Sequence, residues 1–283
     1  MQAATATTTT EPDAVTNVTG TAFVVAEYRA EENYALTPLY RDDVVGLFLS
    51  AASRRAAAQA AAGFPLVKEL VKIRTRYFDD MLERQIAAGC RQVVLLGAGL
   101  DTRAVRKAEP GVRFFEIDDA ATMNLKRYVL NQHRLTADVA FIDGNYVTDG
   151  MLPLLVAHGL DIDVPTFVIW EGNTMYLDAA ADRAILCELR AGLSHVRVSF
   201  DYFVPAVIDR TTGHPALTRM AENFAAMNAP WVTAFDDVRR LAAEVGMEVL
   251  EDVTTAALSR RYRPLNSAPA FGPFYAIATL GSR

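Results

Sequence analysis

The sequence of 283 residues predicts an α/β fold whose parallel sheet is covered by helices on both faces. From residue 92 onward, short runs rich in β-branched and aromatic residues recur, with segments of helical character between them. The first run leads directly into Gly97-Ala98-Gly99, and a glycine turn after the first strand is typical of ligand-binding parallel sheets.

The part of the chain before residue 92 predicts a leader and a helical cover. Residues 1–20 have neither the basic start nor the apolar core of a signal peptide, and their composition predicts a disordered leader. Residues 21–88 predict helices throughout: 41–63 is rich in Ala, and apolar residues in 66–82 recur near helical spacing.

Five strands are expected in residues 92–203, which predict the ligand-binding core; they are 92–96, 112–117, 138–142, 165–170 and 196–203. Helices are expected between them at 120–134 and 178–192. Residues 204–234 interrupt this alternation and predict an inserted lid. The remainder, 235–283, predicts a helix at about 235–245 and strands at 247–253 and 274–280, all within one domain that spans 21–283.

Composition and charge exclude several classes of protein. The chain is 51% hydrophobic and 22% charged, which is typical of a globular protein, and its net charge of -6 argues against a nucleic-acid surface. The sequence has no apolar run long enough to span a membrane and no metal-binding spacing of Cys or His. The two cysteines predict reduced thiols, which are typical of a cytoplasmic protein. We also expect the protein to be monomeric or homodimeric and to act on a small molecule.

The glycine turn favours a nucleoside ligand that carries no phosphate. Gly97 and Gly99 let the backbone approach a ligand closely, but the third glycine of a dinucleotide-binding turn is replaced by Thr102. Asp101 places an anion where phosphates would bind at a helix N-terminus. S-adenosyl-L-methionine (SAM), which is cationic at sulfur and has no phosphate, fits better; the alternative is a tight turn without a ligand.

Acidic residues follow four of the predicted strands. Asp118 lies 19 residues after Gly99 and can accept both ribose hydroxyls, with Glu116 and Asp119 as competitors. Asp143 can accept from an adenine amino group. Together with Asp101 and Glu171, these residues predict one acidic pocket at the carboxyl ends of the strands.

Three stretches carry a resemblance to a known family: LLGAGLDTRAVR, FFEIDDAATMNLKR and FVIWEGNTMYL, preceded by IRTRYFDDML. With them the chain resembles the leucine carboxyl methyltransferase family, whose bacterial branch includes tetracenomycin-type polyketide carboxyl O-methyltransferases. The resemblance covers about 65–203. It implies the class I SAM-dependent methyltransferase fold, which is Rossmann-like, with a seven-stranded sheet whose last strand is antiparallel. A helical N-terminal cover and an inserted lid would roof the substrate pocket.

The resemblance also implies roles for individual residues. Arg74 would hold the SAM carboxylate, with Arg76 as the alternative, and Gly97 and Gly99 would lie under the methionine moiety. Asp118 would bind the ribose, and Asp143 and Glu171 match the acids of the third and fourth strands. Many members have Asp-Leu where this chain has Asp143-Gly144, which makes the adenine contact less secure than the ribose contact. Trp170 is expected in the core, and Lys126 can be purely structural.

The acceptor decides whether a base is needed. A carboxylate is already ionised at pH 7, whereas a phenol or an alcohol needs a general base. Of the four histidines only His214 lies in the inserted segment, and it is the candidate base. The absence of a clear base favours O-methylation of a carboxylate on a metabolite or polyketide-like acid. Base-assisted methylation of a hydroxyl, a nicotinamide oxidoreductase and a non-catalytic SAM-binding protein are the alternatives.

The lid hypothesis extends to residues 21–60 together with 204–234. Both segments are rich in aromatic and apolar residues that could line an acceptor pocket, although ordinary helix packing explains most of them; the aromatic ones are Phe23, Tyr28, Tyr34, Tyr40, Phe224 and Trp231.

Overall fold

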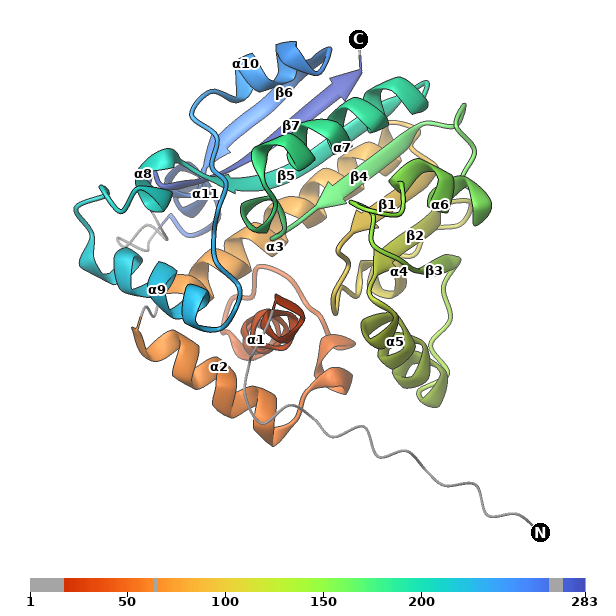
Figure 1. The fold of residues 1–283 in the computed structure, drawn as a ribbon. Coiled ribbons are helices and arrows are strands. Elements are labelled where there is room, and N and C mark those ends of the chain that lie inside the picture. The colour runs from red at the N-terminus through yellow and green to blue at the C-terminus, as the bar shows by residue number, and fades with distance from the viewer. Residues whose placement is uncertain (1–17, 64–65, 265–271, 283) are drawn as a thin grey trace.

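The computed structural model describes residues 18–63, 66–264 and 272–282. Within them the strands form one seven-stranded sheet of order β3-β2-β1-β4-β5-β7-β6 (Figure 1). The last strand, β7, is antiparallel to both β5 and β6, and the pairs among the first five strands are parallel, as predicted. The strands are β1 Gln92–Leu96, β2 Arg113–Asp118, β3 Val139–Asp143, β4 Thr166–Trp170, β5 Val196–Phe203, β6 Met247–Thr254 and β7 Tyr275–Ser282.

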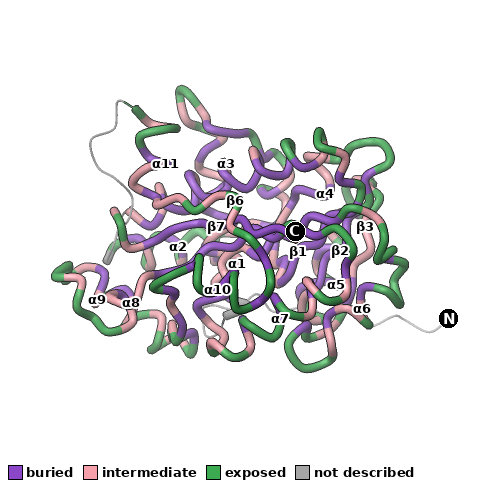
Figure 2. The backbone as a smooth tube through the Cα atoms, turned by 90° about the horizontal axis from the view of Figure 1, so that it is seen from above, coloured by how far each residue is buried: buried purple, intermediate pink, exposed green. Residues whose placement is uncertain are grey.

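Both faces of the sheet are covered by helices. Val93 and Leu95 of β1 pack with α3 (Leu66–Ala87) and α11 (Thr255–Tyr262), whereas Val94 and Leu96 pack into a second core. That second core is formed with α6 (Met151–Ala157), α7 (Ala179–Gly192) and α10 (Val238–Glu244). The sheet appears as a buried layer between the helices in Figure 2. The run of apolar residues in β1 therefore reflects burial on both faces.

A helical cover lies at the carboxyl ends of the strands. It consists of α1 (Val18–Glu31), α2 (Ala51–Gly63) and the inserted α8 (Pro205–Ile208) and α9 (Pro215–Ala226) (Figure 1). Helix α1 packs against α2 and α3, and α2 contacts α9. The insertion between β5 and α10 therefore joins the N-terminal cover over the same edge of the sheet.

Two helices lie beside the glycine turn and β3. The short α4 (Arg103–Arg106) follows the turn directly, and α5 (Ala120–Gln132) packs on β2 and β3. The Asp119 carboxylate caps α5 by accepting from the backbone N–H of Thr122 at 2.9 Å. The cap places the α5 N-terminus at the carboxyl end of β2.

Three details of the chain differ from the sequence prediction. Helix α1 begins at Val18, so the predicted leader 1–20 is too long at its end; residues 1–17 lie outside the described residues. Residues 35–50 are not helical except for a short 3-10 turn, η2 (Val45–Phe48), which corrects the prediction of helices throughout 21–88. Helix α11 has no counterpart in the sequence prediction, and Thr254 caps it by accepting from the backbone N–H of Ala257.

The irregular segment has a physical cause. Asp42 is fully buried and forms an ion pair with Arg29 of α1. It also accepts hydrogen bonds from the Thr102 hydroxyl and from the backbone N–H of Val45. These tertiary contacts outweigh the local helix propensity of the segment.

Among the described helices, none is long and apolar enough to cross a membrane.

Candidate functional site

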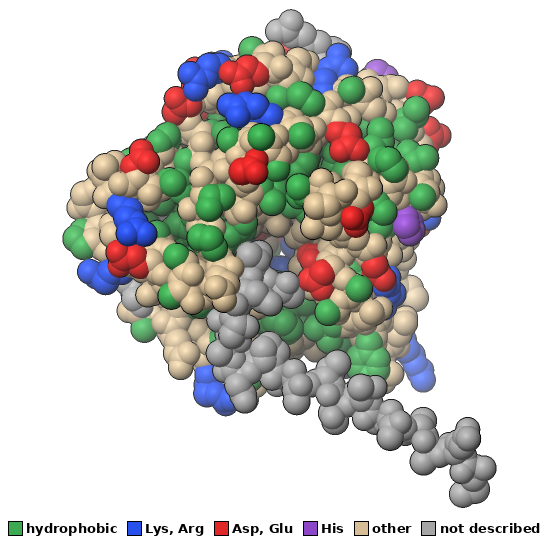
Figure 3. Space-filling view, in the orientation of Figure 1, with side chains coloured by type: hydrophobic (Ala, Val, Ile, Leu, Met, Phe, Trp, Pro, Cys, Tyr) green, Lys and Arg blue, Asp and Glu red, His purple; other side chains and the backbone are tan. Residues whose placement is uncertain are grey.

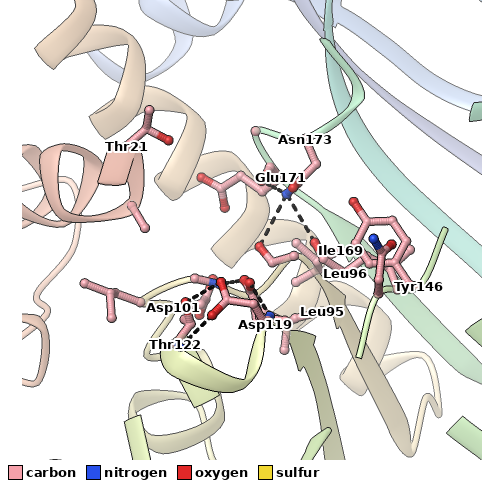
Figure 4. Close-up of a pocket in the computed structure, with 18 of the residues that line it drawn as sticks. Thr21, Leu95, Leu96, Asp101, Asp119, Thr122, Tyr146, Ile169, Glu171 and Asn173 are labelled. Carbon is pink, nitrogen blue, oxygen red and sulfur yellow. Dashed lines mark hydrogen bonds between the residues drawn. The ribbon is translucent and has the colours of Figure 1, made fainter. Parts of the chain in front are cut away.

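A pocket of about 710 Å³ lies where β1, β2, β3 and β4 end, under the first turns of α1. It is lined by every residue that the sequence predicted for cofactor binding: Arg74, Gly97, Gly99, Asp101, Asp118, Asp143 and Glu171. Figure 4 shows Thr21, Asp101 and Glu171, which come from three different elements, around this one cavity. Figure 3 shows a hollow near the middle of the corresponding face, with acidic side chains beside it.

The glycine turn is shaped by a contact with the loop after β4. Gly97 and Gly99 both have positive φ, 60° and 49°. A Cβ on Gly97 would lie 2.3 Å from the side-chain oxygen of Asn173, so the close approach requires glycine. The Asn173 amide donates to the carbonyls of Leu96 and Gly97 at 3.2 and 3.3 Å and to that of Glu171 at 2.8 Å. Asn173 was not predicted, since the only signal was its place in the run WEGN.

Thr102, which takes the place of the third glycine, anchors the cover. Its hydroxyl contacts both carboxylate oxygens of Asp42 at 2.9 and 2.8 Å and accepts from Arg29 at 2.7 Å. Arg29 also lines the pocket and donates to the carbonyl of Leu100 at 3.0 Å. A hydroxyl at this position therefore ties α1 to the glycine turn, which a glycine could not do.

Asp118 lines the pocket at the end of β2. Its two oxygens accept the backbone N–H groups of Gly99 at 2.6 Å and Asp119 at 2.7 Å. A carboxylate has about four acceptor sites, so two remain for a ligand. Burial raises the pKa of Asp118. Its competitors serve other contacts: Glu116 is buried in an ion pair with Lys126, and Asp119 caps α5.

Asp101 and Glu171 belong to a buried charge network. Glu171 accepts from Arg74 and from Arg103, both at 2.8 Å, and Asp101 accepts from the backbone N–H of Arg103 at 2.7 Å. Burial alone would raise the pKa of Asp101, but the positive charges of Arg103 and Arg29 outweigh it and hold that pKa well below its usual range. Asp101 is therefore an anion at neutral pH.

Arg74 is the arginine that reaches the pocket. It is buried, and it donates through Nη1 to Asp201 at 3.0 Å and to the Tyr275 hydroxyl at 2.9 Å. Among the described residues its hydrogen bonds go through Nε and Nη1, and its Nη2 has no hydrogen-bond partner. Gly172 approaches Nη2 closely, since a Cβ there would lie only 3.3 Å from it. Arg76, the alternative, is 40% exposed, pairs with Asp80 at 2.8 Å and lies off the pocket.

The far end of the pocket is formed after β3. Asp143 is exposed, is paired with Arg127 and lies beside Asp118 in the sheet register. Asn145 and Tyr146, which sequence reasoning missed, line the same end. Trp170 is fully buried, as predicted, and donates to the Tyr146 hydroxyl at 3.2 Å.

A second pocket, of about 440 Å³, adjoins the first. The two share the residues Thr21, Val25, Arg74 and Gly172. Three of the aromatic residues named for the lid, Tyr28, Phe224 and Trp231, line this second pocket. Phe23 and Tyr40 pack elsewhere, and Tyr34 is 90% exposed. His214 precedes α9, is exposed and lines neither pocket, so its position gives no support to a catalytic base.

The strand order, the antiparallel β7 and a glycine turn followed by an acid at the end of β2 define the class I methyltransferase fold. Two solved structures share it: a methyltransferase from Thermobifida fusca and a DUF574 family protein from Streptomyces avermitilis. Both are 16% identical to this chain. The Thermobifida fusca structure has a TM-score of 0.65, and the match covers 94% of this chain and 95% of that one. The Streptomyces avermitilis structure has a TM-score of 0.64, and the match covers 93% of this chain and 97% of that one.

The family model described as leucine carboxyl methyltransferase matches residues 22–190, and the chain belongs to that family. A protein of Frankia alni named as an S-adenosyl-L-methionine-dependent methyltransferase is 36% identical over 210 residues, 70% of this chain and 73% of its own length. A protein of Streptomyces coelicolor with the same name is 36% identical over 188 residues, which are 61% of this chain and 64% of that relative.

Proposed function

We propose that this protein transfers the methyl group of SAM to a carboxylate oxygen of a small-molecule acid. One observation carries the proposal: a pocket at the strand ends that several acidic residues line adjoins a pocket under the cover whose one charged side chain is Arg74, and the two share Arg74 and Gly172. The first is assigned to SAM and the second to the acceptor.

The residues of the first pocket suit SAM. The approach of Gly97 to Asn173 makes a cradle that a side chain would fill, and the free Nη2 of Arg74 is available to donate to a carboxylate. Asp118 retains acceptor sites for the two ribose hydroxyls, and Asp143 and Asn145 line the end where adenine would lie. When bound, SAM supplies an activated methyl group on a cationic sulfur.

The lining of the second pocket supports a carboxylate acceptor. It contains no His, Lys, Asp or Glu among the described residues, and Arg74 is its one charged side chain. A carboxylate needs no base, because it is ionised at pH 7. In the transfer the oxygen lone pair forms the new C–O bond as the C–S bond breaks, its electron pair stays on sulfur, and no proton is released. The protein then contributes alignment and exclusion of water.

The proposal is tested by calorimetric titration with SAM, S-adenosylhomocysteine and NAD, followed by transfer of radiolabelled methyl to a panel of acids and phenols. Asp118→Ala should lose two charge-assisted hydrogen bonds and weaken SAM binding by about 10² or more. As a matched control, Asp138→Asn changes an exposed acid outside the pocket and should leave Kd unchanged. Binding of NAD but not SAM, or wild-type affinity in Asp118→Ala, would contradict the proposal.

A further inference from the structure

We infer that Asp201 and Tyr275 are positioning residues, which together orient Arg74 so that its free Nη2 faces the place where the SAM carboxylate would bind. The inference rests on the proposed function, because it explains how the proposed partner of SAM is held. Neither Asp201 nor Tyr275 lines the first pocket, so each would act on the cofactor only through Arg74.

The register of β5 and β7 brings the two side chains together. These strands are antiparallel, and Asp201 lies opposite Ile277, two residues from Tyr275. Residues two apart on a strand point to the same face of the sheet, and a diagonal neighbour is within reach of an aromatic side chain. The face is the one that packs on α3, because Tyr275 and Ile277 belong to the same core as the apolar residues of α3. The Tyr275 hydroxyl accordingly donates to Asp201.

Asp201 is a fully buried carboxylate that receives three donors. One of its oxygens accepts from the backbone N–H of Gly172 at 2.7 Å, and the other accepts from Arg74 Nη1 at 3.0 Å and from the Tyr275 hydroxyl. Its backbone carbonyl accepts from the Thr174 hydroxyl at 2.6 Å. Asp201 therefore places Arg74 and the loop after β4 relative to each other.

These contacts fix the plane of the Arg74 guanidinium. Its Nε donates to Glu171 at 2.8 Å, and its Nη1 donates to Asp201 and to Tyr275, so two of its three nitrogens are held. Because a guanidinium is planar and rigid, holding two nitrogens determines the direction of the third. Arg74 lines both pockets, and Nη2 is the nitrogen that remains for a ligand.

The Tyr275 hydroxyl is the link that can be removed without a change of charge. It accepts from Arg74 Nη1 at 2.9 Å and donates to Asp201. Burial raises the pKa of Tyr275 well above its ordinary value, although the charge of Arg74 opposes the rise, so the hydroxyl keeps its proton. The ring packs edge-on against Phe203 with centroids 4.9 Å apart, a contact that phenylalanine would retain. Tyr275→Phe therefore loosens Arg74 with little change in packing.

A positioning role and a purely structural role predict different patterns of ligand binding. A buried ion pair adds little stability by itself, because the loss of hydration of both charges opposes their attraction. If Asp201 and Tyr275 only supported the fold, their loss would affect every ligand of the first pocket alike. If they orient Arg74, their loss should affect only those ligands that carry a carboxylate for Arg74 to bind.

The experiment compares two ligands by titration calorimetry with the full-length protein. S-adenosylhomocysteine and 5′-methylthioadenosine share the adenosine and the sulfur, and neither has a net charge, but only S-adenosylhomocysteine has the amino-acid end with its carboxylate. Tyr275→Phe should weaken binding of S-adenosylhomocysteine by at least about fivefold, and Asp201→Asn by at least about tenfold. Both variants should bind 5′-methylthioadenosine within about twofold of wild type.

Tyr202→Phe is the matched control. Tyr202 is also a buried tyrosine whose hydroxyl donates to an aspartate, Asp252, at 2.8 Å, and it lines neither pocket. Its substitution should leave the affinity for both ligands unchanged. Thermal unfolding of each variant is recorded, so that binding is compared between folded proteins.

A double-mutant cycle with Arg74→Lys tests whether Tyr275 acts through the arginine. In that background Tyr275→Phe should change the affinity for S-adenosylhomocysteine by less than about twofold, because the planar group that it orients is gone. Additive effects would overturn the inference, as would equal weakening of both ligands by Tyr275→Phe. If wild type binds neither SAM nor S-adenosylhomocysteine, the proposed function fails. If wild type binds both and Tyr275→Phe binds them equally well, only this inference fails.

Discussion

Arg74 and Arg76 lie two residues apart on one helix and have different surroundings. Arg74 is buried and pairs with Glu171 and Asp201, while Arg76 pairs with Asp80 near the surface. A planar guanidinium can donate to several groups at once, which a lysine ammonium cannot reproduce. The position of the free Nη2 therefore makes Arg74, and not its neighbour, the proposed partner of the SAM carboxylate.

We predict that Arg74→Lys weakens SAM binding by at least about tenfold, whereas Arg76→Lys leaves it within about twofold. Titration calorimetry with SAM gives both values. Because Asp201 is fully buried beside Arg74, the thermal unfolding of each variant is recorded too, so that binding is compared between folded proteins. If Arg76→Lys were the only damaging change, the assignment of Arg74 would be wrong.

Asp182 of α7 carries a second prediction at this scale. It is fully buried, and neither of its carboxylate oxygens has a hydrogen-bond partner among the described residues. Burial, reinforced by the charge of Asp178, raises the pKa of Asp182 to about 8. In the unfolded chain an aspartate has a pKa of about 3.9, so between these values the folded state holds a proton that the unfolded state has released.

The contribution of Asp182 to the free energy of unfolding should therefore fall as pH rises from about 4 to about 8 and stay constant above that range. Asp182→Asn removes this titration, so the variant should gain stability relative to wild type as pH increases. Urea unfolding of both proteins at pH 5, 7 and 8.5 measures the difference. A constant difference across the three values would mean that Asp182 is ionised in the folded protein.

At the scale of elements, sequence reasoning succeeded where one local pattern determines the structure. Each of the five predicted core strands exists, because runs of β-branched and aromatic residues with no polar face fit a sheet buried on both sides. It failed where distant contacts decide: Asp42 holds residues 35–50 in an irregular path, and α11, which was not predicted, packs against the distant α3.

The site follows the same division. The positions of Gly97, Asp118 and Glu171 in the pocket could be predicted from their places in the sequence. Asp118 is the last residue of its strand, and Gly97 and Glu171 directly follow theirs. Asp201 and Tyr275 could not, because they meet Arg74 across 127 and 201 residues of sequence. Asn173 could not be recognised either, since its role depends on how closely the loops after β1 and β4 approach each other.

Asn173 gives a prediction about these two loops. Its amide donates to three carbonyls that belong to the ends of β1 and β4. Asn173→Ala should lower the free energy of unfolding by about 1–3 kcal/mol and weaken SAM binding, because the glycine turn loses its support. Asn173→Asp should be at least as damaging, since a carboxylate cannot donate to the carbonyls. Urea unfolding and SAM calorimetry test both variants; an Asn173→Asp protein with wild-type SAM affinity would contradict the role.

At the scale of the molecule, a buried charge network joins the cover to the sheet. Arg29 of α1 pairs with Asp42, and Thr102 contacts both, while Arg106 and Arg103 pair with Asp79 of α3. Since Arg103 also pairs with Glu171, the network runs from the cover to the end of β4. Glu171 also accepts from Arg74, which lines both pockets, so the network reaches the junction of the two pockets. Such support suits a reaction that depends on alignment.

The final prediction concerns the reaction that uses both pockets. If the acceptor is a carboxylate, its methylation should have a rate that stays constant from about pH 6 to pH 9, because the acid and the arginine beside it keep their charges over that range. Burial opposes the charge on Arg74, but Tyr275, Asp201 and Glu171 outweigh it and raise the pKa of Arg74, so the arginine remains a cation. Single-turnover methyl transfer to an acid found in the radiolabelled screen, followed across that range, measures the profile. His214→Ala should leave it unchanged, because His214 lines neither pocket. A rate that rises with pH in wild type and loses that rise in His214→Ala would instead identify a base-assisted transfer to a hydroxyl group.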